Sequence, residues 1–192
     1  MLKNNKGFSL LEILITCVLV FIIGFISMRI HTYHVEKAVV VDAVRIMRNI
    51  LEAEQVYRME NKCWTFSFDE LPIEIGTSLN DSELSNGQLP DQARRTDNFV
   101  FMLASVGSSN VYTVPGNSSF PNIAVIAKRC YPGEPFDEAS YNGYVLYHDM
   151  KPDFTKKFHF QGGTYMTHTD KVILKSIYKF LERKFGQNTV FK

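Results

Sequence analysis

The fold is decided by the stretch Lys6-Gly7-Phe8-Ser9-Leu10-Leu11-Glu12, which joins a short basic leader to a long apolar run. In residues 8–28 the side chains are almost entirely apolar, and Glu12 is the only one that carries a formal charge. A helix of this length would be roughly 30 Å long, which matches the hydrocarbon thickness of a bilayer. The sequence therefore predicts a helix that can span a membrane.

Glu12 is unusual in such a helix, because a carboxylate costs about 2.5 to 3.5 kcal/mol at mid-bilayer and less near the interface. Either Glu12 reaches headgroup water at the interface, or it has a positively charged partner. The leader, residues 1–7, carries Lys3 and Lys6 and is too short to be a secretory signal with its own apolar core. Any cleavage would therefore fall before the apolar run.

The combination of Lys6-Gly7, Phe8, Glu12 and the unbroken apolar run resembles the N-terminal signal of type IV pilins and pseudopilins. This resemblance covers the leader and the apolar run. It implies that a prepilin peptidase cleaves between Gly7 and Phe8 and methylates the new amino terminus, which becomes N-methylphenylalanine. It also implies that Glu12 pairs with the Phe ammonium of a neighbouring subunit, so that an acid within the apolar run sets the register of assembly.

The resemblance further implies a structural subunit, a major or minor pilin, of a type IV pilus. Its partners would be itself in a helical filament, other pilins, the prepilin peptidase and the inner-membrane assembly platform, and its roles would include adhesion, twitching motility or DNA uptake. The leader lysines predict a cytoplasmic N-terminus for the precursor, a single-pass protein of the bacterial inner membrane. The mature chain would then enter an extracellular pilus or a periplasmic pseudopilus.

Two alternatives stay open. The first is a type II secretion pseudopilin, which shares the same fold. The second is a membrane-anchored binding domain that never polymerises. Positive and negative side chains are nearly balanced, 21 Lys plus Arg against 20 Asp plus Glu, which gives no strong bias toward nucleic acid.

Residues 29–61 continue the helical pattern, with an apolar stripe of Val39, Ala43, Ile46, Ile50, Ala53 and Tyr57. Glu54 and Arg58 stand four residues apart and could pair. Asn61 suits the left-handed position that ends a helix. We therefore expect one helix over residues 9–60, whose first half (8–28) is the membrane or filament-core part and whose second half (29–61) packs in the head.

The remaining chain predicts an α+β fold, a type IV pilin-like lollipop with the long helix packed on an antiparallel sheet of four or five strands. Residues 62–98 are expected to be the αβ loop region and residues 99–168 the sheet, with β-rich runs at 99–103, 111–114, 123–127, 144–147 and 154–160. Residues 169–186 predict a C-terminal amphipathic helix.

That C-terminal helix has an apolar stripe formed by Ile173, Ile177, Leu181 and Phe185. Basic residues recur every fourth position, and Lys175, Lys179 and Arg183 form one stripe. The simplest interpretation is a helix packed on the sheet with a solvated basic face. The alternative is a binding patch for an anionic polymer or an acidic partner subunit.

The cysteines and histidines give little indication of chemistry. Cys63 and Cys130 fall in the head, where an oxidising compartment would allow a disulfide; two buried thiols are the alternative. The five histidines lack metal-ligand spacing with Cys or acids, and the chain has neither a Gly-x-Ser-x-Gly elbow nor a Gly-rich phosphate loop. We therefore expect no enzyme, no catalytic residue, no metal site and no cofactor.

Overall fold

The computed structural model describes residues 10–79, 92–106, 112–113, 122–130, 136, 143–161, 168–185 and 189–191. The chain divides into two compact units, Met1–Ala38 and Val39–Lys192. The first helix, α1 (Leu10–Asn61), has residues in both. The predicted cleavage residues Gly7 and Phe8 lie outside the described residues.

α1 is a single helix of 52 residues, and its bounds agree closely with the range expected from the sequence. It ends where Lys62 adopts a left-handed backbone conformation, with φ of 63°. The Lys62 N–H still donates to the Arg58 carbonyl at 2.9 Å, and the Asn61 side-chain amide donates to the Tyr57 carbonyl at 3.1 Å. The expectation that Asn61 itself takes the left-handed position was therefore wrong by one residue.

In the second unit, α1 buries a wider stripe than the sequence predicted. The fully or almost fully buried residues are Val40, Ala43, Val44, Met47, Ile50, Leu51, Ala53 and Glu54. Three predicted stripe residues, Val39, Ile46 and Tyr57, are only partly buried. The stripe prediction was wrong at these positions because the buried face is centred on the row through Val40, Val44, Met47 and Leu51, which lies beside the predicted one.

Residues 62–79 and 92–98, which belong to the expected αβ loop region, contain three short elements. A 3-10 helix, η1 (Phe68–Glu70), follows Ser67, whose hydroxyl accepts a hydrogen bond from the Asp69 N–H at 3.2 Å. Two short strands, β1 (Thr77–Ser78) and β2 (Ala93–Arg95), then begin the sheet. β1 and β2 were not predicted from the sequence within the αβ loop region, because two- and three-residue strands carry almost no periodic signal.

The rest of the sheet consists of β3 (Phe99–Val106), β4 (Tyr112–Thr113), β5 (Asn122–Arg129), β6 (Val145–Met150), β7 (Lys156–Gln161) and β8 (Thr189–Phe191). Strand order is β1-β2-β3-β5-β6-β7-β8, with β4 paired to β3 beside this path. Strands β2, β3, β5, β6 and β7 form a five-stranded antiparallel core. Four of these strands, β3, β5, β6 and β7, lie at predicted β-rich runs, whereas the predicted run at 111–114 is β4 and β2 was not predicted.

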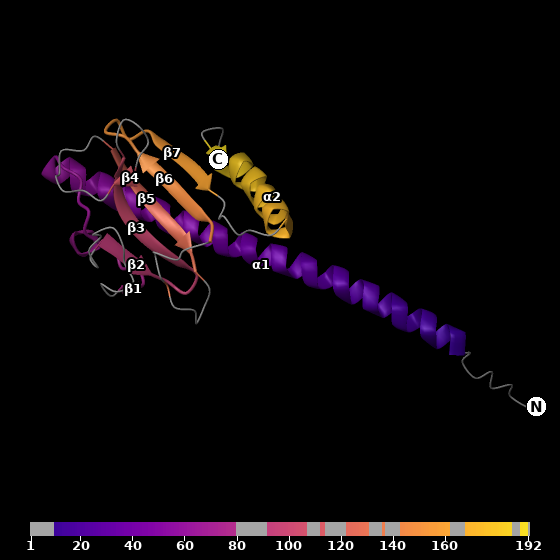
Figure 1. The fold of residues 1–192 in the computed structure, drawn as a ribbon. Coiled ribbons are helices and arrows are strands. Elements are labelled where there is room, and N and C mark those ends of the chain that lie inside the picture. Colours follow the sequence, from indigo (N-terminus) through magenta and orange to yellow (C-terminus); the bar gives the residue numbers. More distant parts are fainter. Residues whose placement is uncertain are drawn as a thin grey trace, which may run out of the picture. The chain divides into compact units, whose positions relative to one another are not determined.

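Both faces of the central strand β3 are buried. Val100 and Met102 pack in a cluster with Leu79, Ala93, Cys130 and Phe136. The alternating residues Phe99, Phe101 and Leu103 project to the opposite face and are equally buried. Figure 1 shows the C-terminal half of α1 passing behind the sheet, where it can cover this second set.

The second helix, α2 (His168–Phe185), begins and ends within one residue of the predicted range. Ile177 and Leu181 are fully buried, which agrees with the predicted apolar stripe, whereas the side chains of Ile173 and Phe185 lie outside the described residues. α2 connects β7 to β8, and these two strands are parallel. A parallel pair requires a long crossover between its strands, and α2 supplies it.

Candidate functional site

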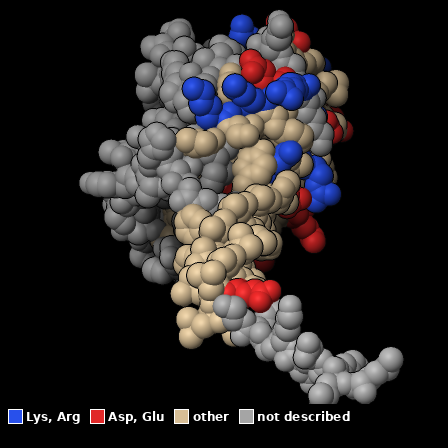
Figure 2. Space-filling view, turned by 90° about the vertical axis from the view of Figure 1, so that its right-hand side faces the viewer, with Lys and Arg blue, Asp and Glu red and all other residues tan. Residues whose placement is uncertain are grey.

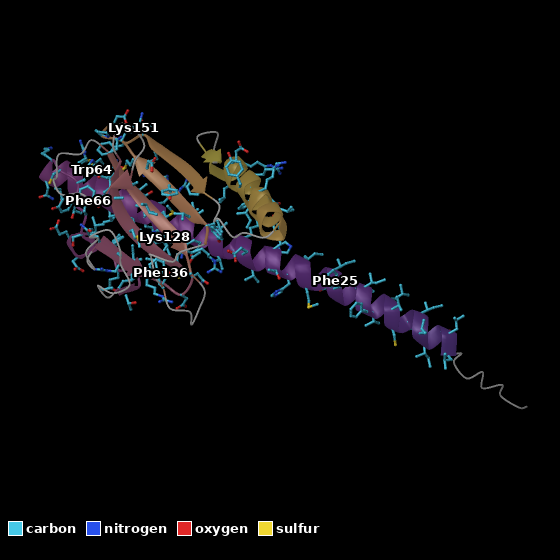
Figure 3. The ribbon with its side chains drawn as sticks, in the orientation of Figure 1. Phe25, Trp64, Phe66, Lys128, Phe136 and Lys151 are labelled. Carbon is cyan, nitrogen blue, oxygen red and sulfur yellow. The ribbon has the colours of Figure 1, made fainter. Side chains whose placement is uncertain are left out.

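The N-terminal part of α1 carries an unusually apolar surface that is exposed throughout. Phe21 is 76% exposed, and the neighbouring large apolar residues are exposed to a similar degree, including Leu10, Leu14, Leu19, Ile23, Phe25 and Met28. Figure 3 shows Phe25 projecting outward from the helix. α1 is the one helix among the described residues that is long and apolar enough to cross a membrane, by length and composition.

Glu12 is the single acid on this apolar segment, and it lies in the first turn of α1. Figure 2 shows the segment as a tan surface with one acidic group next to the residues drawn in grey. The Thr16 hydroxyl donates to the Glu12 main-chain carbonyl at 2.8 Å, which leaves the carboxylate outside this bond. A carboxylate in the first turn is favoured by the helix dipole. Phe8, whose amino group would be the predicted partner of Glu12, lies outside the described residues.

Three basic residues of α2 have described side chains, and they lie on the exposed side of the helix. Lys175, Lys179 and Arg183 are all exposed, while Ile177 and Leu181 anchor the opposite side of the helix. The three cations therefore follow the predicted stripe, one helical turn apart. Nothing in their described surroundings indicates what they would bind, so the anionic-partner patch stays a prediction.

All three cysteines lie in the described residues, and all three are free. The structure therefore does not contain the disulfide between Cys63 and Cys130 that the sequence allowed. Cys130 follows β5 and is buried in the apolar cluster, with its thiol directed at the main-chain carbonyls of Thr96 and Asp97 at 3.7 and 3.9 Å. Burial raises the pKa of this thiol, so the environment favours a packed, neutral thiol.

A polar cluster of Glu54, Tyr57, Thr65 and Glu70 at the C-terminal end of α1 was not predicted from the sequence. Glu54 does not pair with Arg58; its residue is 0% exposed, and its Oε2 accepts a hydrogen bond from the Thr65 N–H at 3.3 Å. Arg58 instead lies over the Trp64 ring, 4.2 Å from the ring centroid. The predicted Glu54–Arg58 pair was wrong, because burial places Glu54 on the inner face of the helix.

Glu70 completes this cluster from η1. Its Oε2 accepts hydrogen bonds from the Tyr57 hydroxyl at 2.8 Å and from the Thr65 hydroxyl at 2.6 Å. These two bonds lower the pKa of Glu70, and the bond to Glu70 raises the pKa of Tyr57 to about 12. Thr65 therefore donates hydrogen bonds to two carboxyl groups. Its N–H donates to Glu54, and its hydroxyl donates to Glu70.

The sequence did contain one signal for this cluster. Glu54 follows Met47 by seven residues and Ile50 by four, so it occupies the same helical face as two buried residues. The partners Thr65 and Glu70 come from the segment after the helix, and no periodic pattern predicts their approach.

Within the described residues, no group of three or more His, Cys, Asp or Glu side chains could hold a metal ion. Comparison with protein-family models, with curated proteins and with solved structures found no significant match.

Proposed function

We propose that this chain is a structural subunit, a major or minor pilin, of a type IV pilus. Prepilin peptidase would cleave it between Gly7 and Phe8 and methylate Phe8, and the subunits would polymerise through the N-terminal part of α1. The observation that carries this proposal is the exposed apolar segment of α1 with Glu12 as its only acid.

The apolar segment supports the proposal because so many large apolar side chains are not stable in water without a cover. Burying apolar surface is worth about 25 cal/mol per Å², so an exposed helix of this kind is strongly driven to associate. Lipid would cover it in the membrane-held precursor. In a filament the same segments of neighbouring subunits would cover one another, so one surface serves both states.

Glu12 supports polymerisation over simple anchoring. A membrane anchor has no need of an acid, and in lipid the carboxylate is a cost. If the acid meets the α-ammonium of a neighbouring Phe8, the charge becomes a device that fixes the register of assembly. Breaking a buried pair of this kind costs about 3 to 5 kcal/mol, because the remaining partner is stranded.

Two other functions would use the same segment. A type II secretion pseudopilin would form a short periplasmic filament, and a membrane-anchored binding domain would remain unassembled. The pilus and pseudopilus differ in where the filament is found, whereas the anchored domain differs from both in forming no filament.

The test is the variant Glu12→Ala, made in cells that contain the assembly machinery. We expect the precursor to be inserted and cleaved normally, as measured by the mass of the mature chain, while its incorporation into sheared filaments is lost or severely reduced. The matched control is Glu52→Ala, which removes an exposed acid from the second half of the same helix and should assemble normally.

Normal assembly of Glu12→Ala would refute the role given to Glu12. The absence of any filament from the unaltered, processed protein would favour the anchored binding domain. Filaments confined to the periplasm would favour the secretion pseudopilin.

A further inference from the structure

The buried carboxyl of Glu54, in the second unit, has a hydrogen-bond partner for only one of its two oxygens. Oε2 accepts the Thr65 N–H, but Oε1 has no hydrogen-bond partner in the described part of the chain, and the residue is 0% exposed. An ionised carboxylate in such a place would be strongly unfavourable, because it lacks the donors that would replace water. A neutral carboxylic acid is far easier to bury.

The neighbouring carboxylate of Glu70 makes ionisation of Glu54 still less favourable. Glu70, on η1, is an anion held by Tyr57 and Thr65, and it interacts electrostatically with Glu54. Tyr57, one turn along α1, and Cys63, after the helix, are the other ionisable groups that the described interactions bring to this cluster. Arg58, the nearby cation of α1, is placed over Trp64. Among the described residues, Glu70 is the charged group that acts on the Glu54 carboxyl.

Thr65 connects α1 and η1 within the cluster. Its N–H is bonded by a residue of α1 and its hydroxyl by a residue of η1, so it ties the end of the helix to the segment that follows. Trp64, its neighbour, is only 2% exposed and lies close to the end of α1, as Figure 3 shows. Anything that weakens the Glu54–Thr65 bond should therefore release Trp64.

We propose that Glu54, Thr65 and Glu70 form a pH-sensitive latch that holds residues 62–71 against the end of α1 while Glu54 is neutral and opens when Glu54 ionises. Ionisation would place two negative charges on the two groups that bond Thr65, one of them buried with an unsatisfied oxygen. The segment would then move away and admit water to Glu54. This inference is independent of the proposed role in a filament.

The direction of the pH dependence follows from the environment. Burial raises the pKa of Glu54 to about 9; the Thr65 N–H acts to lower it, and the charge of Glu70 adds to the rise. The folded state therefore keeps a proton that the unfolded chain releases near the ordinary pKa of a glutamic acid, 4.5. The stabilising contribution of the latch is complete below that value and is lost as the pH rises through about 9.

Trp64 allows a direct test, because it is the only tryptophan of the chain. The experiment uses the full chain in detergent micelles with Cys63→Ser, which removes a sulfur atom next to Trp64 that could quench its fluorescence. Emission is followed from about pH 6 to about pH 10, a range over which Tyr57, the tyrosine of this cluster, stays neutral because its bond to Glu70 raises its pKa to about 12. We expect a reversible red shift with a midpoint near 9, accompanied by loss of the infrared band of a neutral carboxylic acid.

Two variants and one control make the result specific. Glu54→Gln should keep Trp64 buried over the whole range, because the neutral amide cannot ionise. Glu70→Gln should move the transition to lower pH, because it removes the anion that opposes ionisation of Glu54. The control Glu52→Gln, an exposed acid on the same helix, should leave the transition unchanged.

The proposal is overturned if Trp64 emission does not change between these pH values, or if Glu54→Gln shows the same transition as the parent. Should Glu54→Gln fail to fold, as judged by circular dichroism, the infrared measurement on the parent decides. A parent without a neutral carboxylic acid band near neutral pH would also overturn the latch.

Discussion

The turn before β1 depends on Gly76, whose φ of +49° lies in the left-handed region. A Cβ atom built at this position would lie 1.9 Å from the Arg95 carbonyl oxygen and 2.6 Å from its carbon, both of them backbone atoms. Thr77 pairs with Arg95 in the β1–β2 ladder, so the close approach occurs where the sheet begins. Glycine is needed here for both conformation and space.

We therefore expect Gly76→Ala to destabilise the head by about 1 to 3 kcal/mol, since it combines backbone strain with a clash against a paired strand. Chemical unfolding of the full chain in detergent, followed by Trp64 fluorescence, measures the loss. The control is Gly24→Ala, because a Cβ at Gly24 meets nothing within 4 Å and alanine is the better helix former. Equal stability of the two variants would contradict this account of Gly76.

Arg94, on β2, connects the sheet to η1. The Arg94 guanidinium lies over the Phe68 ring, 5.6 Å from its centroid, and the same side chain forms an ion pair with Asp69. Only 9% of the Arg94 side chain is exposed, whereas the Asp69 side chain is 71% exposed. The apolar stem and ring contact are therefore the buried part of this link, and the ion pair is its outer part.

At the scale of elements, the inner face of α1 is the main connection between helix and sheet. Met47 is fully buried near the middle of that face, whereas Val56 is 45% exposed on another side of the helix. We expect Met47→Ala to lower the free energy of unfolding by about 2 to 5 kcal/mol through lost packing and a residual cavity. Val56→Ala should change it by about 0.5 kcal/mol or less.

Denaturant titration of both variants, again followed by Trp64 fluorescence, checks this prediction. The two substitutions remove side chains from the same helix, so an effect on helix propensity alone would be comparable in both. A loss at Met47 no larger than that at Val56 would mean that α1 is not held by its inner face.

The elements with strong periodicity could be predicted from sequence, and those set by distant contacts could not. The bounds of α1, the apolar runs of β3 and β5 and the amphipathic pattern of α2 all follow from local spacing. β1 and β2 are too short to show a period, and β8 depends on the crossover through α2. The same limit applies to the candidate sites, because Glu12 is evident from its contrast with an apolar run, whereas Glu54 requires Thr65 and Glu70 to define it.

At the scale of the whole molecule, the two units differ in the chemistry of their surfaces. The described part of Met1–Ala38 is an exposed helix with a largely apolar surface, and it has no core of its own. The second unit, Val39–Lys192, contains the sheet, the buried face of α1 and the clusters around Cys130 and Glu54. The buried residues that make the fold stable are therefore in one unit, and the most exposed apolar residues among those described are in the other.

This separation predicts the behaviour of a chain that begins at Arg29. Without the apolar segment it should be soluble in the absence of detergent, because the large exposed apolar residues 10–28 are gone. It should unfold cooperatively, with Trp64 buried in the native state, since the core of the second unit is intact. Far-ultraviolet circular dichroism and tryptophan emission measure both properties, and the full chain in detergent is the reference. A shortened chain that aggregates or exposes Trp64 would show that the head depends on the apolar segment for its fold, and the two would then have to be treated as one structural unit.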